Sequence, residues 1–161
     1  MFNLQQLGEQ LQRAVEAAIP GVALDLDAAT DAVAISFVHP GHEATCILVL
    51  EPDAAVGVAL LCAVIVGPWE EAAAADGGVS LFALNPRLMT CSIGLLPINE
   101  DEVAVVLCRR MPAEAVEPSE AVALLNDMIW EYAQLTGGSE PAAAAAPVDR
   151  GPRLIHSLDE V

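Results

Sequence analysis

Residues 32–66, AVAISFVHPGHEATCILVLEPDAAVGVALLCAVIV, decide the fold class of this chain. Three apolar runs rich in β-branched residues are separated by HPGH and EPDAA, short segments that carry Pro, Gly and Asp. Segments of this composition are typical of hairpin connections, which join neighbouring antiparallel strands. We therefore expect an antiparallel sheet, with a further strand over residues 22–26. The run 57–66 is apolar at every side chain, which indicates a strand covered on both faces, although its period alone leaves a helix open.

Helical patterns precede, interrupt and follow these strands. In residues 3–18 the apolar side chains recur at three- and four-residue spacing, and Asn3 is a suitable N-cap. Residues 68–84 begin as a helix with proline in the first turn, but the adjacent pair Gly77-Gly78 predicts a break before a second short helix. Each glycine costs about 1 kcal/mol inside a helix, so the break is favoured over a continuous element. A third helix is expected over residues 118–135.

The expected fold is α+β, an antiparallel sheet with an N-terminal helix, a middle helix and a C-terminal helix. Residues 88–96 and 102–110, joined by PINED, supply a second hairpin. At 161 residues the chain fits one domain, residues 1–138, followed by a flexible Ala- and Pro-rich tail, residues 139–161. The end of the tail has the apolar spacing of a docking peptide, with a remnant without a role as the alternative; its residues are Arg153, Leu154, Ile155 and Leu158.

The charge of the chain is strongly unbalanced. There are 23 acidic and 6 basic residues, the latter all arginine, and the formal net charge is -17. Nucleic acids and anionic membrane surfaces are held through clusters of Lys and Arg, so both are excluded as partners. The carboxylates fit a basic protein partner, or they only keep an apolar domain in solution.

Cysteine usage and the N-terminus favour a cytoplasmic location. The four cysteines lie inside apolar runs without CxxC spacing, as buried thiols do; they are Cys46, Cys62, Cys91 and Cys108. The start of the chain, MFNLQQLGEQ, lacks the basic and apolar regions of a signal peptide. The longest stretch without a charge, residues 54–69, is shorter than the roughly 18 to 20 apolar residues of a membrane-spanning helix, so no span is expected.

Catalytic motifs are not recognisable in the sequence. The segment HPGHE, residues 39–43, with Cys46 offers ligands that zinc prefers, but a fourth ligand is missing nearby, and a polar hairpin turn explains these residues better. Nucleophile elbows, HExxH helices and phosphate- or dinucleotide-binding glycine loops do not occur. The acidic groups Glu70-Glu71 and Glu100-Asp101-Glu102 could serve as general acid and base, but the first suits a helix start and the second a tight turn, so solvated charge explains both better. We expect no enzyme, no metal and no cofactor.

Four segments, in order along the chain, resemble the class I type III secretion chaperones. LFALNPRL (81–88) matches the L-x-x-Asn pattern with which the family commonly ends its middle helix. A hairpin and a closing helix follow in SIGLL (92–96), VAVVLCRRMP (103–112) and EAVALLNDMIWEYAQL (120–135). The similarity covers residues 79–135, and the first helix extends it more loosely. The glycine pair, the additional strand and the tail depart from the family pattern.

The resemblance implies a homodimeric cytoplasmic chaperone. Such proteins hold the N-terminal region of secreted effector proteins in an extended form and keep it competent for secretion. Members with broad effector range also contact the export apparatus, which makes the export ATPase a further partner. The family's dimer packs through the middle helix and the next strand, which here corresponds to Val79, Leu81, Phe82, Leu84 and Met89. Its effector-binding grooves lie on the first helix and the sheet, which corresponds to Leu4, Leu7, Leu11, Ile35, Phe37 and Leu48. An ordinary core position is the alternative for each of these residues.

Two other functions fit the composition. An acidic inhibitor or mimic would occupy the basic surface of a partner protein with its carboxylates, and its binding would weaken steeply with salt. A small enzyme would use carboxylates in a pocket that no sequence motif marks.

Overall fold

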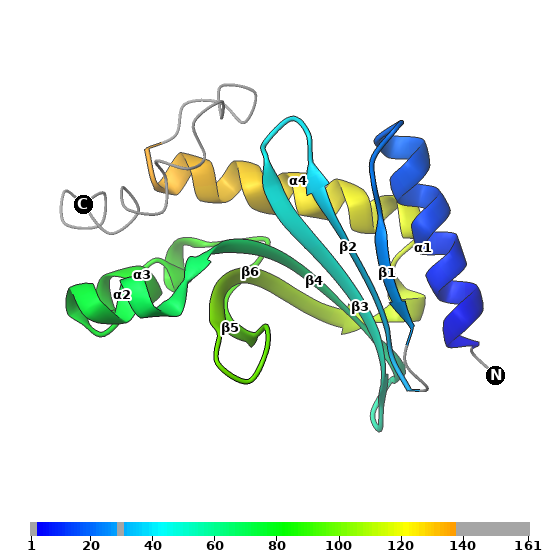
Figure 1. Cartoon of the computed structure of the whole chain (residues 1–161), viewed down its shortest axis with the longest axis horizontal. Helices are drawn as coiled ribbons and strands as arrows, with labels where there is room; N and C mark the ends of the chain where they lie inside the picture. The colour runs from blue at the N-terminus through cyan, green and yellow to red at the C-terminus, as the bar shows by residue number, and fades with distance from the viewer. Residues whose placement is uncertain (1–2, 29–30, 138–161) are drawn as a thin grey trace.

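The computed structural model describes residues 3–28 and 31–137, which form a six-stranded antiparallel sheet with helices packed on it (Figure 1). The helices are α1 (Leu4–Ala18), α2 (Trp69–Asp76), α3 (Val79–Phe82) and α4 (Pro118–Leu135), with short 3-10 turns η1 (Asn85–Arg87) and η2 (Ala113–Ala115). The strands are β1 (Asp25–Ala28), β2 (Val33–His39), β3 (Ala44–Asp53), β4 (Gly57–Pro68), β5 (Ser92–Pro97) and β6 (Val103–Pro112). Their order in the sheet is β1-β2-β3-β4-β6-β5. The α+β class predicted from the sequence is confirmed.

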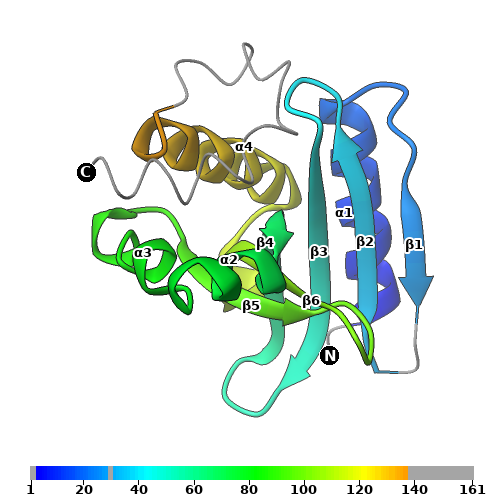
Figure 2. The ribbon, with the colours of Figure 1, turned by 60° about the vertical axis from the view of Figure 1, so that its left-hand side comes forward.

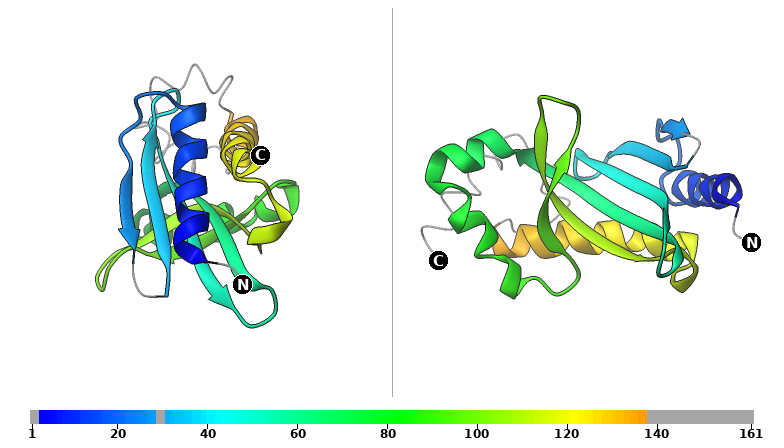
Figure 3. Two further views of the ribbon diagram at one scale, coloured as in Figure 1. Left: turned by 90° about the vertical axis from the view of Figure 1, so that its right-hand side faces the viewer. Right: turned by 90° about the horizontal axis from the view of Figure 1, so that it is seen from below.

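Two helices cover the same face of the sheet. α1 packs on β2 and β3, α4 packs on β4, and the two helices contact each other (Figures 2 and 3). α2 and α3 lie at one end of the sheet, on the side to which the C-terminal end of α4 points (Figures 1 and 2). The face opposite α1 and α4 is called the open face below.

Alternation along the strands separates the two faces. Ile35 of β2 stands opposite Leu48 of β3, and both side chains point to the helices and are buried. The uniformly apolar β4 uses both faces unevenly: Cys62 lies in the main core, whereas Ala63 faces the other way. A small residue such as Ala63 is buried there by its neighbours on β3 and β6, without a helix above it. The expected strand is confirmed, and its second face is covered only in this limited way.

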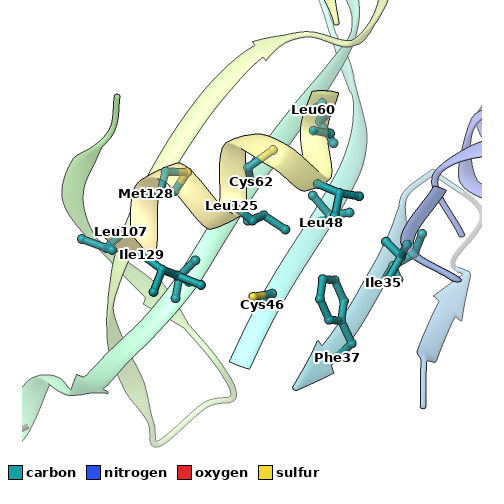
Figure 4. Close-up of a cluster of buried hydrophobic side chains, with 14 of the residues drawn as sticks. Ile35, Phe37, Cys46, Leu48, Leu60, Cys62, Leu107, Leu125, Met128 and Ile129 are labelled. Carbon is teal, nitrogen blue, oxygen red and sulfur yellow. The ribbon is translucent and has the colours of Figure 1, made fainter. Parts of the chain in front are cut away.

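The main core is built from aliphatic side chains of the sheet, α1 and α4 (Figure 4). Full burial of such a side chain contributes about 1.5–3 kcal/mol, so this cluster dominates the stability of the fold. The residues drawn and labelled in Figure 4 are Ile35, Phe37, Cys46, Leu48, Leu60, Cys62, Leu107, Leu125, Met128 and Ile129. A second, smaller cluster on the open face consists of Ala63, Ala104 and Val106, with Ile47, Ile65, Leu96 and Cys108 packed against it.

Local signals fix the ends of the helices. The side chain of Asn3 accepts a hydrogen bond from the Gln5 amide at 3.0 Å, as expected of an N-cap. α2 ends at Gly77, whose φ of 71° is left-handed. Gly78 has φ of 83°, and a Cβ there would lie 2.6 Å from the Trp69 ring, so only glycine fits. The predicted break in the middle helix is therefore confirmed.

Two strands begin later than the sequence indicates. Residues 22–24 stay outside the ladder because Val22 and Leu24 pack against the main core instead, so β1 starts at Asp25. β5 starts at Ser92 rather than at residue 88, because the amides of Met89 and Thr90 donate to Glu131 of α4 and not to a neighbouring strand. The predicted tail, residues 139–161, lies outside the described residues. None of the helices in the described part is long and apolar enough to cross a membrane.

Candidate protein-binding surfaces

α1 is held very close to the sheet by a glycine in its buried face. A Cβ on Gly8 would lie 2.9 Å from Val33 Cγ1, so any larger residue would push the helix away from β2. This close contact turns Leu11 fully into the core, whereas Leu4 and Leu7 are only partly buried. Of the three leucines that the resemblance assigns to effector binding on this helix, Leu4 and Leu7 retain surface that a partner could contact.

The three strand residues assigned to the same groove lie in the core. Ile35, Phe37 and Leu48 all point toward α1 and α4, and each is buried. The structure does bring them together with Leu11 in one cluster, but that cluster is the interior of the domain. The ordinary core position considered for them in the sequence is therefore their position in the structure.

The edge strand β1 carries an exposed apolar side chain on the face that α1 covers. Leu26 stands opposite Ile35, so it lies on the helix side of the sheet, and its side chain is 49% exposed. Asp25 and Asp27 alternate with it and face the other way. Among the described residues, β1 pairs only with β2, which leaves the outer backbone groups of β1 without a strand beside them. Sequence reasoning missed Leu26, although its place between two aspartates marks an exposed strand.

The residues assigned to a dimer interface divide into an exposed and a buried group. Val79 and Met89 are among the most exposed large apolar side chains described, at 70% and 91%. Leu81 and Leu84 are buried in the main core. Phe82 is partly buried against that core, and its ring centroid lies 6.0 Å from that of Trp69. The surface available for contact is therefore formed by the first residue of α3 and by the loop before β5.

Two polar side chains hold that loop in place. Asn85 acts on the backbone of Ile93: its Oδ1 accepts from the amide at 2.5 Å, and its Nδ2 donates to the carbonyl at 3.3 Å. Glu131 on α4 accepts hydrogen bonds from the amides of Met89 and Thr90 and from the Thr90 hydroxyl. These hydrogen bonds fix the loop between α3 and β5 at both ends, and the exposed Met89 belongs to this ordered loop.

A histidine pair marks the turn between β2 and β3. The ring centroids of His39 and His42 are 4.6 Å apart. Partial burial and the neighbouring His42 lower the pKa of His39, while a hydrogen bond with Asn126 opposes the shift. Within the described ranges, no group of three or more His, Cys, Asp or Glu is placed to hold a metal ion. Cys46 points into the core, where burial raises its pKa to about 12.

No family model and no curated protein matches this chain. What the chain does must therefore be argued from its own surfaces: the β1 edge with the half-buried face of α1, and the exposed apolar residues around α3.

Proposed function

We propose that this protein is a cytosolic chaperone that binds the N-terminal region of type III secreted effector proteins, keeps it secretion-competent and delivers it to the export apparatus. One observation carries the proposal: the sheet ends in an open edge strand, β1, with the half-exposed Leu26 on the face that α1 covers, and α1 itself leaves Leu4 and Leu7 partly exposed. The order of helices and strands, which resembles that of the class I chaperones, supports it.

An open edge of this kind suits an extended chain. A segment that adds a strand beside β1 gains main-chain hydrogen bonds, which require no particular sequence. Apolar side chains of the segment that point to the helix side would lie beside Leu26, on the face of the sheet that α1 covers. Binding of this type keeps the captured segment extended, which is the state that secretion requires.

We expect the chaperone to act as a homodimer. A stable dimer buries about 800 Å² on each partner, and Val79 and Met89 offer exposed apolar side chains for such a contact. Because Glu131 and Asn85 brace the segment that carries Met89, little order has to be gained on association. Light scattering on the full chain tests this expectation, and a monomer at working concentration would contradict it.

Co-purification tests the chaperone role. The full chain is expressed with candidate secreted proteins, and the amount of each candidate retained on the purified chain is measured. Leu26→Asp should weaken retention about tenfold, because burying the exposed half of a leucine contributes about 1–1.5 kcal/mol. The matched control is Val38→Asp: Val38 is apolar and 54% exposed, but it lies on the open face, so retention should be unchanged.

Three outcomes would contradict the proposal. The first is that no N-terminal segment of a secreted protein is retained by the wild-type chain. The second is that Leu26→Asp and Val38→Asp weaken retention equally, which would move binding away from the β1 edge. The third is retention that is lost steeply between low and high salt, which favours the acidic inhibitor or mimic instead.

A further inference from the structure

A groove crosses the open face where β4 leads into α2. It has a volume of about 510 Å³ and is lined by the end of β4, the start of α2 and the β5–β6 hairpin. Ile65 and Ala104 of its lining belong to the small apolar cluster of the open face. Ile98 and Val103 add apolar surface from the hairpin, and Ile98 is 45% exposed. The groove is thus an apolar depression on the opposite side of the sheet from α1.

Two carboxylates give this groove a negative charge. Glu70 and Glu102 belong to its lining, and no arginine in the described part of the chain forms an ion pair with either. Arg110, on the same face of β6, is already paired with Glu51 and Asp53 at 3.2 and 2.8 Å. An occupant that covers the groove therefore has to supply its own positive charge beside apolar side chains, since carboxylates are costly to desolvate without a cation.

The chain contains one segment with this chemistry beyond the described residues. Four of its six arginines lie in the described part, at positions 13, 87, 109 and 110, and the other two are Arg150 and Arg153. Leu154 and Ile155 follow Arg153 directly, so the sequence RGPRLI combines two cations with two large apolar side chains. This is the complement of a groove with apolar walls and two carboxylates.

The linker before this segment is long enough for the segment to reach the groove. Twelve residues, 138–149, connect the end of the described part to Arg150. A chain of that length spans up to about 40 Å when extended and about 20 Å on average as a flexible linker. A domain of about 135 residues has a radius of gyration of about 14 Å. The extended linker is therefore long enough to pass around one end of the domain. α4 ends on the side of the molecule where α2 lies (Figures 1 and 2).

We propose that residues Arg150–Leu158 dock into the groove lined by Ile65, Ile98, Glu70 and Glu102, with the two arginines facing the two carboxylates. Tethering makes this contact favourable at modest intrinsic affinity, because a short linker gives an effective concentration in the millimolar range. The inference is independent of the chaperone role, since it concerns the open face, and it holds for any function at the β1 edge.

Methyl-resolved NMR on the full chain tests the docking. The probes are the methyl groups of Ile65, Ile98 and Val103 in the groove, with Val38 as a remote reference on the same face. Arg150→Glu with Arg153→Glu, and separately Leu154→Ser with Ile155→Ser, should shift the groove signals. Val148→Ser, an apolar-to-polar change just outside the docking segment, should leave them in place.

A charge exchange separates docking from indirect effects. Glu70→Arg with Glu102→Arg should shift the groove signals in the same way, and adding Arg150→Glu with Arg153→Glu should restore the wild-type positions. Unchanged groove signals in both tail variants would overturn the proposal. Signals that revert to the undocked positions on dilution would also overturn it, because the occupant would then be a second copy of the chain.

Discussion

Replacing Asn85 tests whether one side chain organises the entry into β5. In the structure this amide makes two hydrogen bonds to the backbone of Ile93, a residue that is only 5% exposed. Asn85→Ala would leave the Ile93 amide without its partner, which costs about 1–3 kcal/mol, and would remove a second bond worth about 0.5–1.5 kcal/mol. We expect a total loss of about 2–4 kcal/mol in the free energy of unfolding.

Urea denaturation followed by circular dichroism measures this loss. With a slope near 2 kcal/mol/M, the midpoint should fall by about 1–2 M at unchanged slope. Asn85→Asp keeps the acceptor for the Ile93 amide and loses the donor, so its midpoint should lie between those of the wild type and the alanine variant. Asn99→Ala is the matched control: its side chain also accepts from two amides, of Asp101 and Glu102, but in an exposed turn, so the loss should stay below about 1 kcal/mol.

The reasoning would be refuted if Asn85→Ala and Asn99→Ala shifted the midpoint equally. It would also be refuted if the Ile93 amide exchanged with solvent no faster in Asn85→Ala than in the wild type, because the hydrogen bond would then not be what protects it.

Three further predictions concern the helices and the thiols. Gly8→Ala should destabilise the fold by about 1–2 kcal/mol in urea denaturation, since overpacking against Val33 outweighs the gain of about 1 kcal/mol in helix propensity. Adding Val33→Ala should recover part of this loss. Strictly additive losses in the two variants would contradict the close contact. Glu131→Ala should speed amide exchange in the loop before β5 about tenfold, and unchanged exchange would show that the carboxylate does not brace it. Burial raises the pKa of Cys46 and Cys62 to about 12 in the folded state, above the usual value near 9. Unfolding therefore releases their protons at high pH, and the free energy of unfolding should fall as pH rises from 9 to 12. The fall should be less steep when either cysteine is replaced by Ala.

Much of the fold was predictable because its signals are local. Turn residues between the apolar runs of β2, β3 and β4 determined the antiparallel order, and the pair Gly77-Gly78 determined the break between α2 and α3. The start of β1 was not predictable in this way. Val22 and Leu24 have the alternation of a strand, but they fill space under the helices, and only the packed structure decides between these two uses.

The binding surfaces were predictable to a smaller extent. Alternation shows which residues share a face, but the depth of a residue depends on what the rest of the chain places above it. Leu4 and Leu11 lie on the same face of α1, yet Leu11 is buried and Leu4, at the end of the helix, is partly exposed. Leu26 was overlooked for the opposite reason, since its exposure follows from the position of β1 at the sheet edge.

The irregularity in β4 has a consequence for how the sequence can vary. Ile65 stands opposite Val106, the next partner in register is Gly67, and Pro68 then lies opposite Ala104. Odd-numbered residues therefore face the groove side before this bulge, and even-numbered ones face it afterwards. Two residues of β4, 66 and 67, stand against the single residue Val105, so losing one of them would leave Ile65 and Pro68 with their present partners and faces. In the regularly paired part of β4, losing one residue would exchange the two faces of the strand. Relatives that keep the fold should therefore accept a one-residue deletion in β4 at the bulge and not before it.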